Sequence, residues 1–211
     1  MKKPTITKSS LLQILTGTFV ACLLVSNVLA AKTFTLGPVV LPTAVIIFPV
    51  VYIVNDVLAE VYGYQKTKRI IYLGFALNLL AVIAYAIAIK LPAPVFATEG
   101  AAAFAVTLGS TGRLLIASFA AYLVGSLLNA LVMVKMKKSL SKYLMLRCIT
   151  STFVGEGLDA LVFISIAFGG TMPVKELAIM IVAQATFKTV FELIVFPVTK
   201  VVIKTADNLR E

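Results

Sequence analysis

Residues 149–168 read ITSTFVGEGLDALVFISIAF, an apolar run that holds two acids, Glu156 and Asp159, near its middle. A run of about 20 apolar residues is long enough for a helix to cross a membrane. A charged side chain in hydrocarbon costs at least about 3 kcal/mol, so it faces a bundle interior or a wet cavity and pairs with other charges. The run therefore predicts a membrane-spanning helix whose acidic face is turned toward a polar interior.

More charged and polar side chains lie within or at the margins of other apolar runs. Spacings of three or four residues place each set on one face of a helix. The sets are Asp56 with Glu60, Glu156 with Asp159, and Gln184 with Lys188 and Glu192. A chain that only anchored or braced other proteins would have little reason to bury so many charges. We therefore predict that this chain handles a polar solute inside the membrane.

Composition indicates an integral membrane protein and argues against several kinds of chemistry. Of the 211 residues, 60% are hydrophobic, whereas soluble domains have about 45–50%. Histidine is absent, which excludes Ser–His hydrolysis and His-ligated metal sites, and no Gly-x-Ser-x-Gly turn or nucleotide-binding loop occurs. Cys22 and Cys148 lie far apart in sequence and are interpreted as small buried apolar residues. We predict no enzyme activity, no cofactor and no metal site.

Six apolar segments can be drawn along the chain, and together they predict the fold. They cover about residues 11–31, 39–59, 70–89, 114–134, 149–168 and 176–199. No linker, repeat or low-complexity tract separates them. We predict an all-α, polytopic membrane bundle of six transmembrane helices that forms a single domain over residues 1–211.

The net charge of +10 indicates membrane topology rather than nucleic-acid binding. Lys and Arg concentrate in the N-terminal tail, in the second and fourth connections and at the C-terminal end, which six spans would place on one side of the membrane. By the positive-inside rule that side is the cytoplasm, so both termini are predicted there. The basic loop 135–142 is interpreted as part of this orientation signal, and contact with anionic lipid is the alternative.

The first segment has an alternative interpretation. Lys2 and Lys3, the apolar run and the small residues up to Ala31 resemble a cleavable signal peptide. The apolar run of about 20 residues is long for a signal core, however. Cleavage would also leave five spans and place the new N-terminus outside. We favour a retained helix.

Proline and glycine predict breaks in and after the second segment. Pro49 falls inside it and removes a backbone hydrogen bond, so we expect a bent or locally unwound helix, of the kind tolerated where it lines a cavity. Gly63 is placed to end this helix as a left-handed residue. The connection from Lys90 to Gly112 is rich in Ala, Pro and Gly and would form either a short surface helix or a lid over an outer mouth.

Several charged candidates have a purely structural alternative. Lys188 could neutralise Asp159 or Glu192 as a buried pair that holds two helices together. Glu60 lies near enough to the inner interface to be solvated. Asp56 and Asp159 fit a structural role least, because short acidic side chains well inside a span cannot reach water and tend to titrate or bind something.

Other polar residues add to the candidates at the ends and centres of the segments. Asn27 lies near the outer end of the first segment, and Arg113 lies at the outer start of the fourth. Arg113 could face the substrate or only anchor the interface. Asn78 and Asn129 are interpreted as interhelical hydrogen-bonding groups rather than ligands.

Aromatic and small residues indicate how the helices pack. Most rings on the charged segments are expected to pack or face lipid, and one or two beside Asp159 and Lys188 would suit stacking on a flat ring. These rings are Phe48, Tyr52, Phe153, Phe163, Phe187 and Phe191. On the fourth segment a small-xxx-small stripe lets another helix approach closely. We favour a helix of the same chain over a helix of a partner protein. The stripe consists of Ala117, Ala121 and Gly125.

Five sequence blocks, in order and spread over nearly the whole chain, resemble a known family. The longest block is Phe48-Pro49-x-x-Tyr52-x-x-Asn55-Asp56-x-x-x-Glu60-x-Tyr62-Gly63. The others are Ser26-Asn27 with Lys32, Arg113-x-x-x-Ala117-Ser118, Gly155-Glu156-x-x-Asp159 with Phe163 and Ile166-Ala167-Phe168-x-Gly170, and Phe187-Lys188 with Pro197. In these blocks the chain resembles the queuosine precursor transporter family, also called the vitamin uptake transporter family.

The resemblance implies a multi-pass protein of the cytoplasmic (inner) membrane that imports a deazaguanine precursor for tRNA queuosine salvage. The implied substrate is 7-cyano-7-deazaguanine or its aminomethyl form, carried without an ATPase partner. The positions that the resemblance carries over are Asn27, Asp56, Arg113, Glu156, Asp159 and Lys188. The implied partners are the deazapurine and the lipid bilayer, with no nucleic acid, and a homo-oligomer is compatible.

The chemistry of the residues supports this interpretation. A carboxylate accepts the ring N–H and the exocyclic amine of a deazaguanine edge side by side. We assign this role to Asp159, and Lys188 would balance its charge or donate to the substrate carbonyl. The full candidate substrate-binding set is Asn27, Asp56, Glu60, Arg113, Glu156, Asp159, Gln184, Lys188 and Glu192. Asp56 and Glu60 would serve the inward half of the path.

Two functional alternatives remain open at the level of the sequence. Uptake could be a proton symport or a facilitated diffusion followed by metabolic trapping. The chain could instead be the membrane-embedded substrate-binding subunit of an ATP-driven vitamin uptake complex, since six helices and about 200 residues are compatible with either role. Sustained uptake by this chain without any ATPase would exclude the second.

Overall fold

The computed structural model describes residues 7–37, 39–109, 112–170, 173–207 and 209. Within these residues the chain is almost entirely helical, with one short β-hairpin after the first helix. The elements are α1 (Lys8–Leu29), β1 (Thr33–Leu36), β2 (Val39–Pro42), η1 (Thr43–Ile46), α2 (Phe48–Tyr62), α3 (Tyr64–Lys90), η2 (Val95–Ala97), α4 (Thr98–Leu108), α5 (Gly112–Ser139), α6 (Leu144–Phe168) and α7 (Val174–Asp207).

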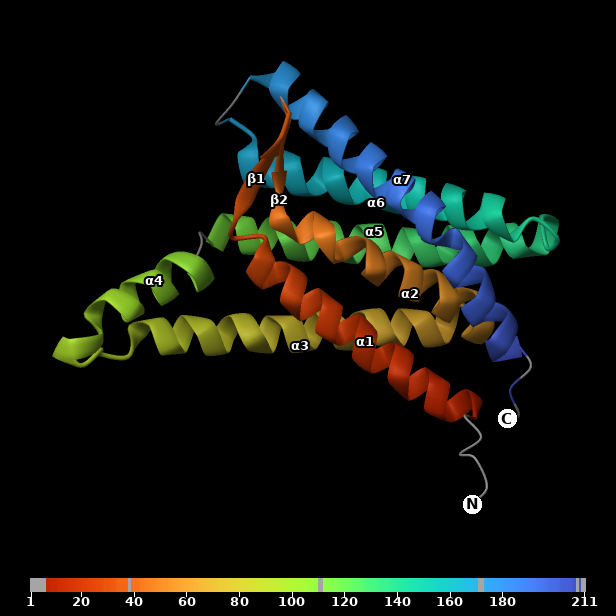
Figure 1. The fold of residues 1–211 in the computed structure, drawn as a ribbon, viewed down its shortest axis with the longest axis horizontal. Helices are drawn as coiled ribbons and strands as arrows, with labels where there is room; N and C mark the ends of the chain where they lie inside the picture. Colours follow the sequence, from red (N-terminus) through yellow and green to blue (C-terminus); the bar gives the residue numbers. More distant parts are fainter. Residues whose placement is uncertain (1–6, 38, 110–111, 171–172, 208, 210–211) are drawn as a thin grey trace.

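The long helices lie side by side in a bundle (Figure 1). α1 begins and α7 ends at one end of this bundle, where the chain also turns from α2 into α3 and from α5 into α6. The hairpin, α4 and the start of α7 lie at the other end. The strands of the hairpin are antiparallel and pair Thr33 with Pro42 and Leu36 with Val39. We refer to the two ends as the terminal end and the hairpin end.

Five of the described helices, α1, α3, α5, α6 and α7, are long and apolar enough to cross a membrane. α2 has only 15 residues, fewer than the roughly 20 that a span needs. The predicted second span over residues 39–59 is therefore not one continuous helix. Its first part forms β2 and η1 instead, because Gly37, with φ of 60°, turns the chain back into a hairpin.

The break predicted in the second segment is present, but it lies before Pro49 rather than at it. Pro49 occupies the first turn of α2, where a missing N–H leaves no intrahelical hydrogen bond unmade. Gly63 ends α2 as predicted, with φ of 79°, a region that residues with a Cβ rarely adopt. Its own N–H donates to the Ala59 carbonyl at 3.2 Å, and α3 starts at the next residue.

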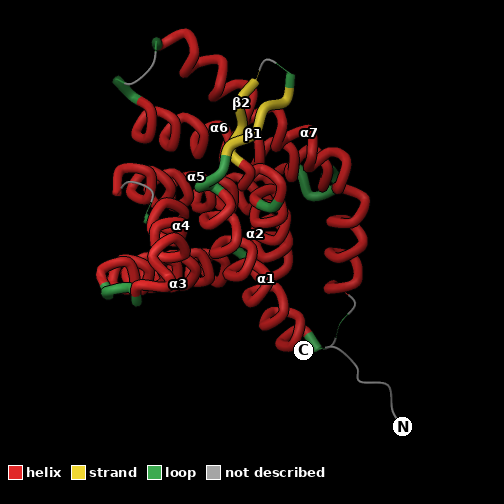
Figure 2. The backbone as a smooth tube through the Cα atoms, turned by 60° about the vertical axis from the view of Figure 1, so that its left-hand side comes forward, coloured by secondary structure: helices red, strands yellow, loops and turns green. Residues whose placement is uncertain are grey.

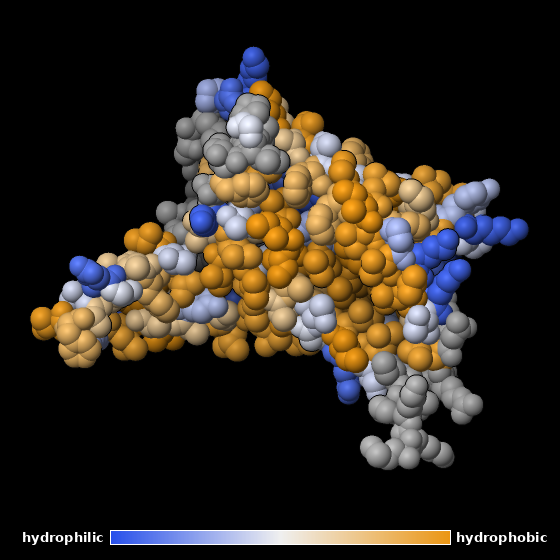
Figure 3. Space-filling model, viewed as in Figure 1, coloured by the Kyte–Doolittle hydropathy of each residue, from blue (hydrophilic) through white to orange (hydrophobic). Residues whose placement is uncertain are grey.

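The surface of the bundle is apolar where lipid would contact it. Large aliphatic side chains on α3 and α7 are exposed, among them Leu80, Ile83, Val182 and Ile194. Figure 3 shows hydrophobic residues across the middle of the visible face and hydrophilic ones mainly toward its ends. Because the interior holds many of the charged groups, this arrangement is typical of a multi-pass membrane protein with a polar path inside.

The connection from Lys90 to Gly112 contains η2 and α4. α4 packs beside α3 (Figure 2), and its flanking residues Val95 and Phe96 are each 92% exposed. Of the two predicted arrangements, the short surface helix therefore matches the structure better than the lid.

Candidate functional site

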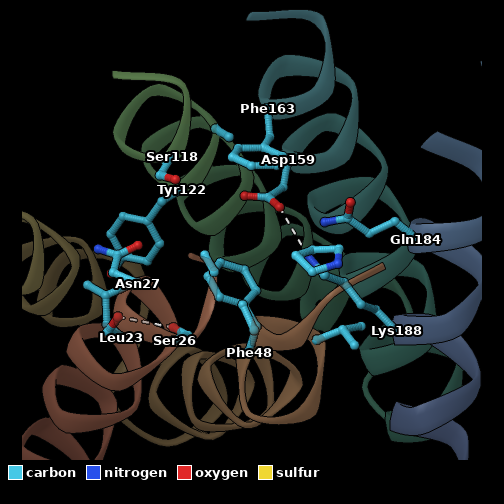
Figure 4. Close-up of a pocket in the computed structure, with 15 residues that line it drawn as sticks. Leu23, Ser26, Asn27, Phe48, Ser118, Tyr122, Asp159, Phe163, Gln184 and Lys188 are labelled. Atoms are coloured by element: carbon cyan, nitrogen blue, oxygen red, sulfur yellow. Dashed lines mark hydrogen bonds and ion pairs between the residues drawn. The ribbon is translucent and has the colours of Figure 1, made fainter. Parts of the chain in front are cut away.

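A cavity lies within the bundle near the hairpin end, between α1, α2, α5, α6 and α7. Its volume, taken as the space open to the centre of a water-sized sphere, is about 50 Å³, room for a few water molecules in this structure. The lining residues are Leu23, Ser26, Asn27, Ala30, Pro42, Ala44, Val45, Phe48, Ser118, Ala121, Tyr122, Asp159, Phe163, Gln184 and Lys188. Figure 4 shows Asp159, Gln184 and Lys188 on one side of this space and Asn27 and Tyr122 on the other.

A buried lysine between two acids forms the charged wall of the cavity. Lys188 Nζ donates to Asp159 Oδ2 at 3.0 Å and also pairs with Glu156 Oε2. All three side chains are almost fully buried. Two acids against one base leave the group with a formal charge of −1 if all three are ionised. An excess charge in a low-dielectric interior favours a bound partner that donates hydrogen bonds or carries a proton.

Aromatic rings form a second wall of the cavity. Lys188 Nζ lies 4.3 Å from the centroid of the Phe48 ring and 5.7 Å from that of Tyr52, so both rings stabilise its charge through their faces. Phe163 lines the cavity one turn of α6 beyond Asp159. The prediction that one or two rings lie beside Asp159 and Lys188 is confirmed for Phe48 and Tyr52, whereas Phe153 is 58% exposed on the outside.

Three polar atoms around the cavity are buried but make no hydrogen bond within the described part of the chain. They are Asn27 Nδ2, Gln184 Oε1 and Tyr122 Oη. Buried polar atoms almost always have a partner in native structures, in protein, ligand or ordered water. Their convergence on one cavity therefore indicates that it holds water or a polar ligand with both donors and acceptors.

Close contact between α5 and α6 positions the acids of the site. A Cβ on Gly125 would lie 2.9 Å from the Gly155 carbonyl oxygen and 2.9 Å from Asp159 Cβ, and a Cβ on Gly155 would lie 2.8 Å from Asn129 Cβ. Only glycine permits this approach. The small-residue stripe of α5 thus packs against a helix of the same chain, as preferred from the sequence, and Ala117 and Ala121 in it are fully buried.

A second polar cluster lies deeper in the bundle and does not line the cavity. Asn129 Nδ2 donates to Asp56 Oδ1 at 2.6 Å, and Ser151 Oγ lies 3.3 Å from the same oxygen. Glu192 lies next to Asp56 and is 2% exposed. This cluster connects α2, α5, α6 and α7.

A third cluster occupies the terminal end. Arg147 forms a two-pronged ion pair with Glu60, in which Nη1 pairs with Oε2 and Nη2 donates to Oε1 at 3.1 Å. Lys137 Nζ lies 3.1 Å from Glu60 Oε1 and donates to the Glu60 carbonyl at 2.7 Å. Arg147 is 2% exposed. These contacts tie α2, α5 and α6 together at this end, and we call Glu60, Lys137 and Arg147 the inner ion-pair cluster.

A family model described as "Putative vitamin uptake transporter" matches residues 42–202. The chain belongs to the vitamin uptake transporter family. Neither the curated proteins nor the solved structures give a match to it.

Membership of the vitamin uptake transporter family agrees with the fold. A transporter family is not a class of enzyme, and five apolar helices of spanning length are those of a multi-pass membrane protein. The matched range includes most of the candidate residues, from Asp56 to Glu192, and both glycines of the α5–α6 contact. Asn27 lies before it.

In this member of the vitamin uptake transporter family, the predicted site residues lie in three layers of the bundle. Four predicted residues line the cavity: Asn27, Asp159, Gln184 and Lys188. Glu156 lies behind them, paired with Lys188. Asp56 and Glu192 lie in the second cluster, and Glu60 lies in the inner ion-pair cluster. These three residues do not line the cavity. Arg113 belongs to the first turn of α5, and its side chain lies outside the described part of the chain.

Sequence reasoning missed three contributors to these layers. Arg147 and Lys137 were attributed to the orientation signal, yet they bind Glu60. The signal that could have found Arg147 is its place four residues before Ser151, at the start of the helix that carries Glu156 and Asp159. Tyr122 lines the cavity and had no sequence signal beyond its spacing of four from Ser118 and Ser126.

Proposed function

We propose that this protein imports a deazaguanine precursor of queuosine across the cytoplasmic membrane, as a secondary transporter or facilitator. The observation that carries the proposal is the convergence of three features on one cavity: polar atoms without a partner among the described residues, an acid–lysine group and aromatic rings. Membership of a transporter family supports the general activity. The match between the cavity chemistry and a flat, polar, neutral heterocycle supports the substrate.

Each wall of the cavity holds a side chain that can bind one part of such a substrate. Asp159 can accept the ring N–H and the exocyclic amine together, while Lys188 pairs with the same carboxylate. Phe48 lines the cavity and offers an aromatic ring to pack against the heterocycle. Asn27, whose Nδ2 has no partner within the described residues, can donate to a carbonyl oxygen. A base without those donors and acceptors would leave buried polar groups unpaired and bind much more weakly.

The position of the inner ion-pair cluster suggests the direction of the path. The cavity is lined by Ala30, Pro42 and Ala44 at the hairpin end, whereas Glu60 and Arg147 join the helices at the terminal end. If both termini are cytoplasmic, as the distribution of Lys and Arg predicts, the cavity opens outward and the cluster closes it inward. Import then requires that the Glu60–Arg147 pair separate.

Binding and uptake test the proposal separately. Thermal unfolding of the purified protein should shift upward with 7-cyano-7-deazaguanine and not with guanosine, since only a ligand that prefers the folded state stabilises it. Cells that cannot make the precursor should gain uptake of it from this chain alone. Wild-type uptake by an Asp159→Asn, Lys188→Ala double variant would refute the assigned roles.

The same uptake measurement decides between this proposal and the ATP-driven alternative. A substrate-binding subunit would bind the deazapurine but would not sustain uptake when expressed without an ATPase. We expect sustained uptake. Binding without uptake, in cells shown to insert the protein in the membrane, would favour the binding subunit instead.

A further inference from the structure

Asp56 and Glu192 do not line the cavity, and they form a buried pair of acids. A carboxylate oxygen of each, together with Cys148 Sγ, lies within 4.8 Å of the others. Asp56 is fully buried and Glu192 is 2% exposed. Both oxygens of Glu192 lack a hydrogen-bond partner within the described residues, and so does the hydroxyl of Thr152, which lies beside it.

No basic side chain in the described part of the chain pairs with this carboxylate pair. Lys188, one turn before Glu192, is paired with Glu156 and Asp159. Arg147, next to Cys148 in sequence, is paired with Glu60. The groups that α5 and α6 contribute around the pair are neutral: Asn129, Cys148, Ser151 and Thr152. Two ionised acids this close in a low-dielectric interior repel strongly, so the pair needs a bound cation.

The polar contacts of Asp56 indicate which acid of the pair would hold a shared proton. Asn129 turns its N–H, not its carbonyl oxygen, toward Asp56 Oδ1 at 2.6 Å. An N–H donor stabilises an anionic carboxylate oxygen. Asp56 therefore suits the ionised member of the pair. Glu192, which has the hydroxyl of Thr152 rather than an amide N–H beside it, suits the member that holds the proton and donates it to Asp56.

We propose that Asp56 and Glu192 bind one exchangeable proton and that its passage couples substrate import to the proton gradient. The proposal rests on the proposed function. The proton binds a carboxylate oxygen from water on the outer side and is released as a hydronium ion to the cytoplasm. One neutral substrate and one proton then cross together, and one positive charge moves inward in each cycle.

The two helices that carry the acid pair also carry two of the side chains proposed to bind the substrate. This gives the coupling a mechanical basis. Phe48 and Asp56 belong to α2, and Lys188 and Glu192 are one turn apart on α7. A shared proton links α2 to α7, whereas its loss sets two like charges against each other across the same contact. The proton therefore favours the arrangement in which Phe48 and Lys188 face one cavity.

Transport by the purified protein in liposomes tests the coupling, with labelled 7-cyano-7-deazaguanine as the probe. Counterflow without any gradient measures transport itself. An imposed gradient of one pH unit, alkaline inside, with the membrane potential clamped at zero, should drive accumulation up to about tenfold, because one unit is a tenfold ratio of protons. Glu192→Gln cannot release a proton, so its accumulation ratio should stay near one and its counterflow should no longer vary with pH.

Matched variants and ions complete the test. Glu176→Gln, an exposed acid in the first turn of α7, should accumulate substrate like the wild type. Asp56→Asn should behave like Glu192→Gln. Accumulation driven by a sodium gradient but not by the pH gradient would overturn the proposal, as would undiminished pH-driven accumulation in Glu192→Gln. Wild-type counterflow without any pH-driven accumulation would overturn the coupling alone, whereas no counterflow at all would overturn the proposed function as well.

Discussion

Lys188 is the residue on which the cavity depends most. It lies between Glu156 and Asp159 and against the face of Phe48, and it is 2% exposed. A buried ion pair contributes little net stability, but removing one partner leaves the other charge uncompensated. Removing the lysine would therefore leave both acids without their basic partner and weaken the fold.

At this scale we expect Lys188→Met to lower the stability of the fold by about 3–5 kcal/mol, the usual result of breaking a buried pair. The measurement is the unfolding of the purified protein in detergent, followed by circular dichroism. Lys175→Met, an exposed lysine near the start of the same helix, should change stability little.

A rescue variant separates charge from packing at this position. Adding Glu156→Gln and Asp159→Asn to Lys188→Met removes the uncompensated charges and should recover much of the lost stability, without recovering transport. If the triple variant is no more stable than Lys188→Met, the loss comes from packing, and the electrostatic account of the site is wrong.

At the scale of elements, the contact between α5 and α6 determines where the acids point. Gly125 and Gly155 let the two backbones approach so closely that a Cβ on either would lie within 3 Å of the opposite helix. Asp159 and Glu156 flank this contact on α6 and are held toward α7. The helix pair thus acts as a rigid support for the charged wall of the cavity.

We expect Gly155→Ala to destabilise the protein by about 1–3 kcal/mol, because the added methyl group overpacks a contact that has no space for it. Gly157→Ala is the matched control on the same helix, since a Cβ there meets nothing within 4 Å. Relative to the wild type, Gly157→Ala should be neutral or slightly stabilising, as alanine favours a helix over glycine. Equal losses in both variants would contradict the close α5–α6 contact.

At the scale of the whole molecule, the fold separates a polar interior from an apolar exterior. The buried charges form three layers from the cavity through the carboxylate pair of Asp56 and Glu192 to the inner ion-pair cluster. Exposed aliphatic side chains cover the helices outside them. A path for a polar solute across the membrane requires this inversion of the usual soluble arrangement.

The predicted orientation can be tested with single cysteines in a background free of Cys22 and Cys148. A cysteine at Ala102, on the exposed face of α4, should react in intact cells with a thiol reagent that cannot cross the membrane. A cysteine at Lys138, in the last turn of α5 at the terminal end, should react only after the membrane is opened. The opposite pattern would place the termini outside and contradict the assigned direction of the path.

The sequence by itself determined which residues share a face and that those faces are polar. Helical spacing grouped Asp56 with Glu60 and Lys188 with Glu192, because 3.6 residues per turn is a local property of the backbone. Composition indicated a membrane protein, and the sequence blocks indicated the family that the comparison shows. Such features need no knowledge of the other helices.

Only the tertiary structure decided which faces meet. Spacing alone put Asp56 and Glu60 together, yet the structure pairs Glu60 with Arg147 and brings Asp56 beside Glu192, more than a hundred residues away. It also replaced the start of the second span with a hairpin. The physical reason is that partners across helices are chosen by close packing and by the neutralisation of buried charge. Both of these depend on all the helices at once.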